Sequence, residues 1–292
     1  MIGVRLQGGL GNQLFQYAAG LRLALRHRTG LTLDLGGLGS SGAETRRRFE
    51  LDAFAIEACR VGRPAESGLG RSIGRARRRI AALRGSPRPL GLRPIVERGP
   101  AFDPALLDAP DGVYLEGYWQ SEKYFEDVEP VVRAQLRIVP PPASEIEEWV
   151  RELPRVEAVA IHVRRGDYVT SPANRRFHGA LPAEYYRAAV AEVVRRVPRP
   201  EFFVFSDDPA WCASSLALPC RFTVMDGSAR PSYEDLRLMS LCRNHVIANS
   251  AFSWWGAWLA GARDGLVIAP RRWFLDSTVD TRDLTPPSWM RL

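Results

Sequence analysis

The second half of the chain alternates short apolar runs with segments of helical periodicity, and this alternation constrains the fold more than any other feature. The apolar runs, predicted to be strands, are residues 156–162, 202–205, 222–224, 245–248 and 266–269. The segments between them, predicted to be helices, are residues 182–197, 209–216, 232–242 and 252–260. Strands that are apolar throughout are buried on both faces, so this order predicts a parallel, doubly wound α/β sheet.

The N-terminus begins with a unit of the same kind. Residues 2–6 are predicted to form a strand, residues 12–27 a helix and residues 31–35 the next strand. The following segment, 36–110, is rich in Gly, Pro and Arg, and no elements are predicted in it. Consecutive prolines at 140–142 can neither continue a helix nor pair in a sheet. We therefore expect two α/β domains, residues 1–142 and 143–292, facing a cleft.

Composition narrows the class of protein. A chain of 292 residues with 46% hydrophobic and 25% charged residues is typical of globular proteins that fold around two cores. Residues 1–6 run straight into a Gly-rich turn, so no signal peptide is predicted. Four cysteines without a Cys-x-x-Cys pair, and four histidines without zinc-ligand spacing, predict reduced thiols, a cytoplasmic location and no metal site.

The net charge of +7 comes from arginine, and part of it is concentrated in residues 71–84. Six arginines there share the segment with Ile73, Ile80 and Leu83. This pattern fits a basic amphipathic helix in peripheral contact with an anionic membrane at its inner face, and it fits equally a solvated helix face. Neither a nucleic-acid-binding module nor aromatic platforms lie beside the charge, so nucleic acid is not an expected partner.

The heptapeptide His162 to Tyr168 directly follows a predicted buried strand. It places Arg164, Arg165 and Asp167 at the carboxyl end of that strand, where ligands of open α/β sheets bind. Arginine grips phosphate with a planar fork of donors and stays charged at any working pH. The segment therefore predicts a phosphate site, although an exposed Arg165–Asp167 ion pair would leave the same pattern.

The Gly-rich turn at 8–11 is not a dinucleotide fingerprint, because Leu14 stands where the third small residue should be. It still predicts a tight strand-to-helix turn, with Gly9 and Gly11, whose amides can face an anion.

Two further strand ends carry polar residues. Ser206 or Asp207 is predicted to cap the helix that starts at Pro209, and a carboxylate there can instead bind a ribose hydroxyl. Asn249, Ser250 and Ser253 open another helix, where hydroxyls and free amides suit a phosphate, while Trp254 and Trp255 are predicted to pack in the core. The chain contains no Asp-x-Asp, which disfavours a metal-bridged diphosphate site.

Four segments in this order and spacing, residues 8–17, 162–168, 205–208 and 249–258, resemble glycosyltransferase family 11, the α-1,2-fucosyltransferases. Residues 117–121 also fit. The resemblance implies an enzyme of the GT-B fold, with two Rossmann-like domains facing a cleft: residues 1–142 on the acceptor side and residues 143–292 binding the GDP-sugar. It further implies GDP-L-fucose as donor, a terminal galactose of a surface glycan as acceptor, inversion at the anomeric carbon, and no metal or other cofactor.

The same resemblance assigns roles to residues. His162 and Arg164 match positions that contact the donor, with Arg164 at the β-phosphate, and Asp235 resembles a carboxylate that reads guanine. Asn12 would face the fucose from across the cleft, and the catalytic candidates are Arg164, Asp167 and Asn12. The remaining donor-binding candidates are Arg165, Asp207, Asn249, Ser250, Phe252, Ser253, Gly9 and Gly11.

The catalytic base stays open at this stage. An inverting transfer needs a proton acceptor for the attacking hydroxyl, and Asp167, Glu116 and His178 are candidates. Asp167 can instead brace Arg164 or Arg165, and the leaving phosphate can itself accept the proton. Two other functions also remain open, a GT-B transferase that uses another GDP-sugar and a sugar-binding domain without catalysis.

Overall fold

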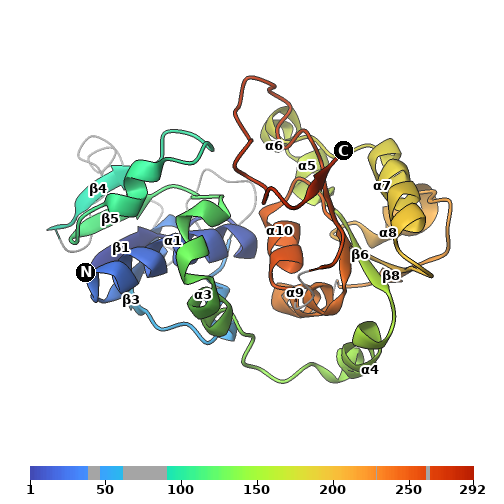
Figure 1. Cartoon of the computed structure of the whole chain (residues 1–292), viewed down its shortest axis with the longest axis horizontal. Helices are drawn as coiled ribbons and strands as arrows, with labels where there is room; N and C mark the ends of the chain where they lie inside the picture. The colour runs from blue at the N-terminus through green and yellow to red at the C-terminus, as the bar shows by residue number, and fades with distance from the viewer. Residues whose placement is uncertain (39–46, 62–90, 228, 261–263) are drawn as a thin grey trace, which may run out of the picture. The chain divides into compact units, whose positions relative to one another are not determined.

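The computed structural model describes residues 1–38, 47–61, 91–227, 229–260 and 264–292 (Figure 1). They form two compact units: unit 1 comprises Met1–Asp52 and Ile56–Gln135, and unit 2 comprises Ala53–Ala55 and Leu136–Leu292. Phe54 belongs to unit 2 because it forms an antiparallel bridge with Ile138. The division after Gln135 lies a few residues before the proline run that suggested a boundary at 142.

Unit 1 is built on a sheet in which every strand pairing is parallel, in the order β3-β2-β1-β5-β4. The strands are β1 (Ile2–Arg5), β2 (Leu31–Asp34), β3 (Cys59–Val61), β4 (Arg93–Val96) and β5 (Val113–Glu116). The central strands β1 and β5 are buried almost throughout, whereas the edge strands β3 and β4 are largely exposed or half-buried. Smaller elements complete the unit: η1 (Leu35–Gly37), η2 (Leu51–Ala53), η4 (Pro104–Asp108), η5 (Glu122–Tyr124), η6 (Glu126–Val128) and α3 (Glu129–Gln135).

Helix α1 (Leu10–His27) starts two residues earlier than predicted, with Gly9 at its N-cap. Gly8 has φ +79, a conformation that favours glycine, and so permits the sharp turn from β1 into the helix. The helix lies close to β1, because a Cβ at Gly20 would come within 2.4 Å of Val4 Cγ2. Leu25, which the helical periodicity places with the apolar face, is 39% exposed because the last turn leaves the core.

Unit 2 contains a second parallel sheet, in the order β11-β10-β9-β6-β7-β8. Its strands are β6 (Ala158–Val163), β7 (Glu201–Ser206), β8 (Phe222–Met225), β9 (Asn244–Val246), β10 (Val267–Ala269) and β11 (Met290–Arg291). Numbered within the unit, this is the order 3-2-1-4-5-6 of dinucleotide-binding Rossmann folds. The strands β6, β7 and β8 follow one another toward one edge of the sheet, and β9, β10 and β11 follow one another toward the other edge. The strand order therefore reverses between β6 and β9, and ligands of such sheets bind beyond the carboxyl ends of the strands near that point.

Both faces of this sheet are covered, as the continuously apolar strands predict (Figure 1). Val159, Ile161 and Val163 of β6 pack with α7 (Ala183–Arg196) and α8 (Pro209–Ser215). The alternate residues Ala158 and Ala160 point to the other core, which α4 (Glu147–Glu152) and α9 (Ser232–Leu241) cover. Helix α10 (Ala251–Trp258) packs closely on α9, since a Cβ at Gly256 would lie 2.7 Å from Met239 Cε.

The predicted α/β class and the strand and helix order of the second half are confirmed. The sequence did not predict α4, α5 (Gly166–Thr170), α6 (Pro172–Phe177), the final strand β11, or the short elements η7 (Ser144–Ile146) and η8 (Leu153–Arg155). In unit 1 it did not predict β5, α3, or the strands β3 and β4, which lie in the segment 36–110 where no elements were expected. Each is too short to show a periodicity. The basic segment 71–84 lies outside the described residues. Within the part of the chain that the structure describes, no helix is both long and apolar enough to cross a membrane.

Candidate functional site

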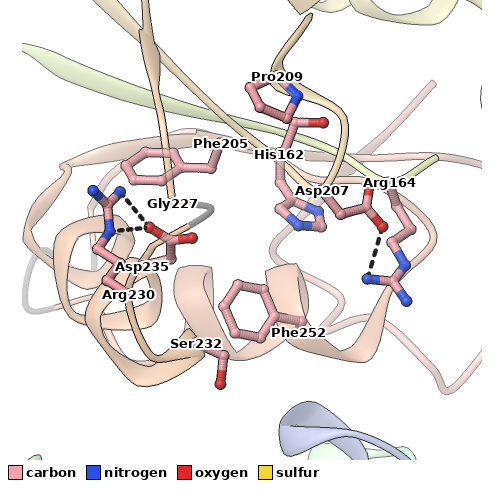
Figure 2. A pocket seen from close by; sticks show the side chains of 11 residues that line it. His162, Arg164, Phe205, Asp207, Pro209, Gly227, Arg230, Ser232, Asp235 and Phe252 are labelled. Atoms are coloured by element: carbon pink, nitrogen blue, oxygen red, sulfur yellow. Dashed lines mark hydrogen bonds and ion pairs between the residues drawn. The ribbon is translucent and has the colours of Figure 1, made fainter. Parts of the chain in front are cut away.

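A pocket of about 350 Å³ lies in unit 2 at the carboxyl ends of β6, β7 and β8 (Figure 2). It is lined by His162, Arg164, Phe205, Ser206, Asp207, Pro209, Gly227, Arg230, Ser232, Asp235 and Phe252. These residues come from three strand ends and from the first turns of α8, α9 and α10. The topology of the sheet therefore places the pocket where the strand order predicts a ligand.

Arg164, the first residue after β6, is held by two carboxylates. Its Nη2 donates to Asp167 Oδ1 at 2.6 Å, and its Nη1 lies 2.9 Å from Asp207 Oδ2. The guanidinium also lies over the ring of Tyr168, 5.5 Å from the ring centroid. Burial alone would lower the pKa of Arg164, but Asp207 and Asp167 raise it, so the group stays charged. Since a guanidinium has five N–H donors, these two contacts leave donors for an anion.

Asp207 also fixes the backbone of the loop that carries Arg164. Its Oδ1 accepts a hydrogen bond from the backbone N–H of Arg165 at 2.8 Å. Gly166 leaves room for this carboxylate, because a Cβ there would come within 2.5 Å of Asp207 Oδ2. The carboxylate therefore lies at the pocket wall and orients both the Arg164 side chain and its backbone.

The residue that caps helix α8 was predicted one or two positions too early in the sequence. Asp208, rather than Ser206 or Asp207, caps the helix, because its Oδ1 accepts from Trp211 N at 3.2 Å. The hydroxyl of Ser206 accepts from Asp208 N at 2.9 Å and so supports the cap.

Arg165 points to a different set of partners from those of Arg164. Its Nε donates to Asp208 Oδ2 at 3.0 Å, and its guanidinium lies 3.9 Å from the ring centroid of Trp211. Arg165 does not line the pocket. The alternative ion pair between Arg165 and Asp167 is not formed, since each pairs with another residue.

His162, in β6, lies at the centre of the pocket wall. It is 5% exposed, its ring centroid lies 5.6 Å from that of Phe252, and its Nδ1 has no partner among the described residues. Burial lowers the pKa of His162 to about 4, although Asp207 opposes the shift. The imidazole is therefore neutral at physiological pH and can donate or accept one hydrogen bond within the pocket.

Asp235, in the first turn of α9, forms an ion pair with Arg230. Both Nε and Nη2 of Arg230 donate to Asp235 Oδ1, at 2.8 and 2.5 Å, and Arg230 Nη1 donates to the backbone carbonyl of Asp226 at 2.7 Å. Burial raises the pKa of Asp235, and Arg230 opposes the shift. Gly227 allows the preceding loop to approach, because a Cβ there would lie 2.2 Å from Asp235 Oδ2.

Of the candidates in the segment that follows β9, Phe252 lines the pocket. Asn249 Nδ2 donates to the carbonyls of His178, Gly179 and Trp273 at 3.1, 3.2 and 3.1 Å. The Ser253 hydroxyl donates to backbone carbonyls of its own turn. Ser250, Ser253 and Asn249 are buried and do not line this pocket, and among them Asn249 connects separate loops through its side chain. Trp254 and Trp255 are fully buried, as predicted.

The predicted site residues of unit 1 lie at the β1–α1 turn. Gly9 is the N-cap of α1 and Gly11 is buried in its first turn. Asn12 Oδ1 accepts a hydrogen bond from Gln120 Nε2 at 2.7 Å.

The candidate bases have different surroundings. Asp167 is paired with Arg164, and Glu116 lies 3.4 Å from Arg5 Nη1. His178 stacks on Tyr168, with ring centroids 4.6 Å apart, and burial lowers the pKa of His178 to about 4. In the described parts of the chain, no group of three or more His, Cys, Asp or Glu residues is arranged to hold a metal ion.

Sequence reasoning missed several lining residues as ligand contacts, and Arg230 is the charged one among them; the others are Phe205, Ser206, Pro209, Gly227 and Ser232. A signal for Arg230 exists in the sequence: an arginine precedes Pro231 and the acidic first turn of the helix at the end of a predicted strand. The pairing with Asp235 follows from the turn at Gly227, where Arg230 N donates to Gly227 O at 3.3 Å.

Comparisons with known proteins agree with this architecture. The model of the family described as glycosyl transferase family 11 matches residues 98–292. Over 98% of its length the chain is 31% identical to the O-antigen biosynthesis glycosyltransferase WbnK of Escherichia coli, covering 99% of that protein. It is also 31% identical to an alpha-1,2-colitosyltransferase of Escherichia coli, with coverage of 99% and 97%.

The solved structure of a mutant of Arabidopsis thaliana FUT1 in complex with GDP has a similar fold, with a TM-score of 0.50, 12% sequence identity, and coverage of 99% of this chain and 75% of that chain. The two parallel α/β units and this similarity identify the fold as GT-B. With the match to the family model and the similarity to both full-length relatives, the chain belongs to glycosyltransferase family 11 and is a glycosyltransferase.

Proposed function

We propose that this protein transfers L-fucose from GDP-fucose to the 2-hydroxyl of a terminal galactose-type residue in a surface glycan, with inversion and without a metal ion. The observation that carries the proposal is the arrangement of charges along one pocket. Asp235 and Arg230 lie at one end and Arg164 with Asp207 at the other, while His162, Phe205 and Phe252 lie between them (Figure 2).

This order of groups fits a guanosine diphosphate. The carboxylate of Asp235 can accept hydrogen bonds from the N1–H and 2-amino donors of guanine, and Phe205 and Phe252 provide apolar surface for the nucleoside. The free donors of Arg164 can bind the diphosphate at the opposite end. The GDP in the structure of similar fold from Arabidopsis supports a guanine nucleotide as the ligand.

Arg164 would supply the main catalytic contribution. As the bond between the anomeric carbon and the β-phosphate oxygen breaks, its electron pair passes to the leaving GDP, and the guanidinium stabilises the growing negative charge. Asp167 and Asp207 keep that guanidinium in place before the donor arrives. The acceptor oxygen attacks from the opposite face of the sugar, and Asp167 or the leaving phosphate takes its proton.

A GDP-sugar other than GDP-fucose, such as GDP-colitose, is a second candidate donor, because one full-length relative is named as an alpha-1,2-colitosyltransferase. The site in unit 2 does not distinguish GDP-fucose from another GDP-sugar with the same nucleotide. The deciding experiment is to incubate the protein with GDP-fucose, GDP-colitose or GDP-mannose and lactose, and to measure both GDP release and the glycoside product. Release of GDP only from a donor other than GDP-fucose would replace fucose in the proposal.

GDP should stabilise the protein without added metal. A ligand that binds only the folded state, at 100 times its dissociation constant, adds about 2.7 kcal/mol to the free energy of unfolding. We expect a clear rise in melting temperature with GDP in the presence of EDTA, and a smaller rise with ADP. A shift that appears only when manganese replaces EDTA would contradict the metal-free mechanism.

From the basic segment 71–84 we further propose that the protein is cytoplasmic and makes peripheral contact with the inner face of the membrane. Each arginine near an anionic lipid surface contributes roughly 1 kcal/mol to binding. We expect the protein to sediment with vesicles that contain phosphatidylglycerol in low salt and to be released in high salt. Equal sedimentation with neutral vesicles would exclude an electrostatic contact.

A further inference from the structure

The loop that follows β5 in unit 1 holds one aromatic side chain exposed and the next one buried. Tyr118 is 44% exposed, whereas Trp119 is 2% exposed. Trp119 has φ +56, a left-handed backbone conformation that residues other than glycine rarely adopt. Such strain persists only where the surroundings enforce it, and it gathers at binding and catalytic sites.

Glu97, immediately after β4, enforces this conformation. Its Oε2 accepts from Tyr118 N at 2.6 Å and its Oε1 accepts from Trp119 N at 2.8 Å. Gly117 permits the close approach, because a Cβ at that position would lie 2.4 Å from Glu97 Cβ. Burial raises the pKa of Glu97, while the two amide hydrogen bonds oppose the shift. The partly buried carboxylate of Glu97 therefore fixes the backbone conformation of the loop at Tyr118 and Trp119.

The same loop is fastened to the β1–α1 turn. Gln16 Nε2 donates to Gly117 O at 3.0 Å, and Gln16 Oε1 accepts from Gln7 N at 3.0 Å. Gln120 Nε2 donates to Asn12 Oδ1 at 2.7 Å. Because β1, β4 and β5 are parallel neighbours, all of these groups lie at the carboxyl edge of the sheet of unit 1, where α/β sheets bind ligands.

The resulting surface suits a sugar ring. An exposed tyrosine on a rigid loop offers a flat apolar face and loses little conformational entropy on binding. Within the described residues, the Asn12–Gln120 amide pair leaves Asn12 Nδ2 as a donor and Gln120 Oε1 as an acceptor without hydrogen-bond partners. Both residues are half-buried, so neither group is closed to solvent. A sugar hydroxyl, which donates and accepts at once, matches such a pair.

We propose that the carboxyl edge of the unit 1 sheet is a subsite for a neutral pyranoside, in which Tyr118 stacks on the sugar ring and the Asn12–Gln120 pair binds its hydroxyls. As the acceptor subsite of the transferase this rests on the proposed function, but glycan binding itself does not require transfer. Tyr118 and Gln120 then determine which glycan is accepted, and Glu97 is a positioning residue.

The test measures binding without turnover. Saturation-transfer NMR is recorded on the full chain with GDP and with methyl β-D-galactoside, lactose or N-acetyllactosamine as probe. We expect saturation transfer to at least one probe, a roughly 10-fold weaker affinity in Tyr118→Ala, and near-normal affinity in Tyr118→Phe, which keeps the ring. Val131→Ala, at another exposed apolar position of unit 1, is the matched surface control and should bind as the wild type does.

The outcomes separate the subsite from the proposed function. Equal binding by wild type and Tyr118→Ala, or no binding of any probe by the wild type, overturns the subsite whatever the transfer assay shows. Tyr118-dependent binding without transfer from any GDP-sugar keeps the subsite and rejects the transferase. If transfer occurs, the acceptor KM should rise about 10-fold in Tyr118→Ala while the donor KM is unchanged. Unfolding temperatures of the variants show that the fold is intact.

Discussion

Arg164→Ala is expected to reduce sugar transfer by roughly 100- to 1000-fold, because removal of one pre-oriented donor to a developing anion typically costs about 2.7 to 4 kcal/mol. The loss should fall mainly on kcat, since the contact strengthens as the leaving GDP gains charge. Arg164→Lys should recover little activity, because a single ammonium cannot contact two carboxylates and a phosphate with the geometry of a guanidinium. Steady-state kinetics of transfer measure both variants.

Arg165→Ala is the matched control for this prediction. The two arginines are neighbours and both are ion-paired, but only Arg164 lines the pocket. We expect a much smaller loss of turnover in Arg165→Ala, together with some loss of stability, since Asp208 and Trp211 lose a partner. Similar losses in the two variants would show that the phosphate does not lie at Arg164.

Stability must be separated from catalysis in the Arg164 variant. Removal of the Arg164 guanidinium deprives the carboxylates of Asp167 and Asp207 of the cation they share, so the unfolding temperature of the variant should fall. The double variant Arg164→Ala/Asp207→Asn removes one of these charges and retains an oxygen for the N–H of Arg165. It should regain stability without regaining turnover, and recovery of turnover would assign the single variant's defect to folding.

The fold of unit 2 could be predicted because its signal is local. Val159, Ile161 and Val163 lie on one buried face of β6, and Ala158 and Ala160 lie on the other. Because both faces are buried, such a strand can be recognised in the sequence as a continuous apolar run. The parallel direction of the strands also follows from the geometry of βαβ units, in which a helix connects two parallel strands, whereas the order of the strands in the sheet is known only from the structure. The placement of His162 and Arg164 at the end of β6 needed no more than this reasoning.

The partners within the site could not be predicted in the same way. Asp207 reaches Arg164 across 43 positions of sequence, and Asn249 reaches His178 across 71, so only the folded sheet shows these contacts. A polar residue at a strand end can bind a ligand or fasten a neighbouring loop, and its position along the strand does not decide between them. Asn249 and Ser253 illustrate the second outcome, because their hydrogen bonds go to backbone carbonyls.

Asp235→Asn is expected to weaken GDP binding by roughly 100-fold or more. Hydrogen bonds to a charged group contribute about 1.5–3 kcal/mol each, and the proposed contact offers two of them to guanine. The substitution leaves an amide oxygen for Arg230, so its guanidinium keeps an acceptor. It replaces the other carboxylate oxygen by an N–H donor, which repels the 2-amino group of guanine. Calorimetric titration with GDP measures the loss.

Nucleotide analogues distinguish a contact with guanine from a general disturbance of the pocket. The wild type should bind GDP about 10-fold or more tightly than inosine diphosphate, which lacks the 2-amino group, and Asp235→Asn should lose that preference. Xanthosine diphosphate presents a carbonyl at the same position, which the new amide N–H can bind. Asp235→Asn should therefore prefer xanthosine diphosphate to GDP. A variant that binds all three nucleotides equally weakly would show that Asp235 supports Arg230 and the Gly227 turn but does not read the base.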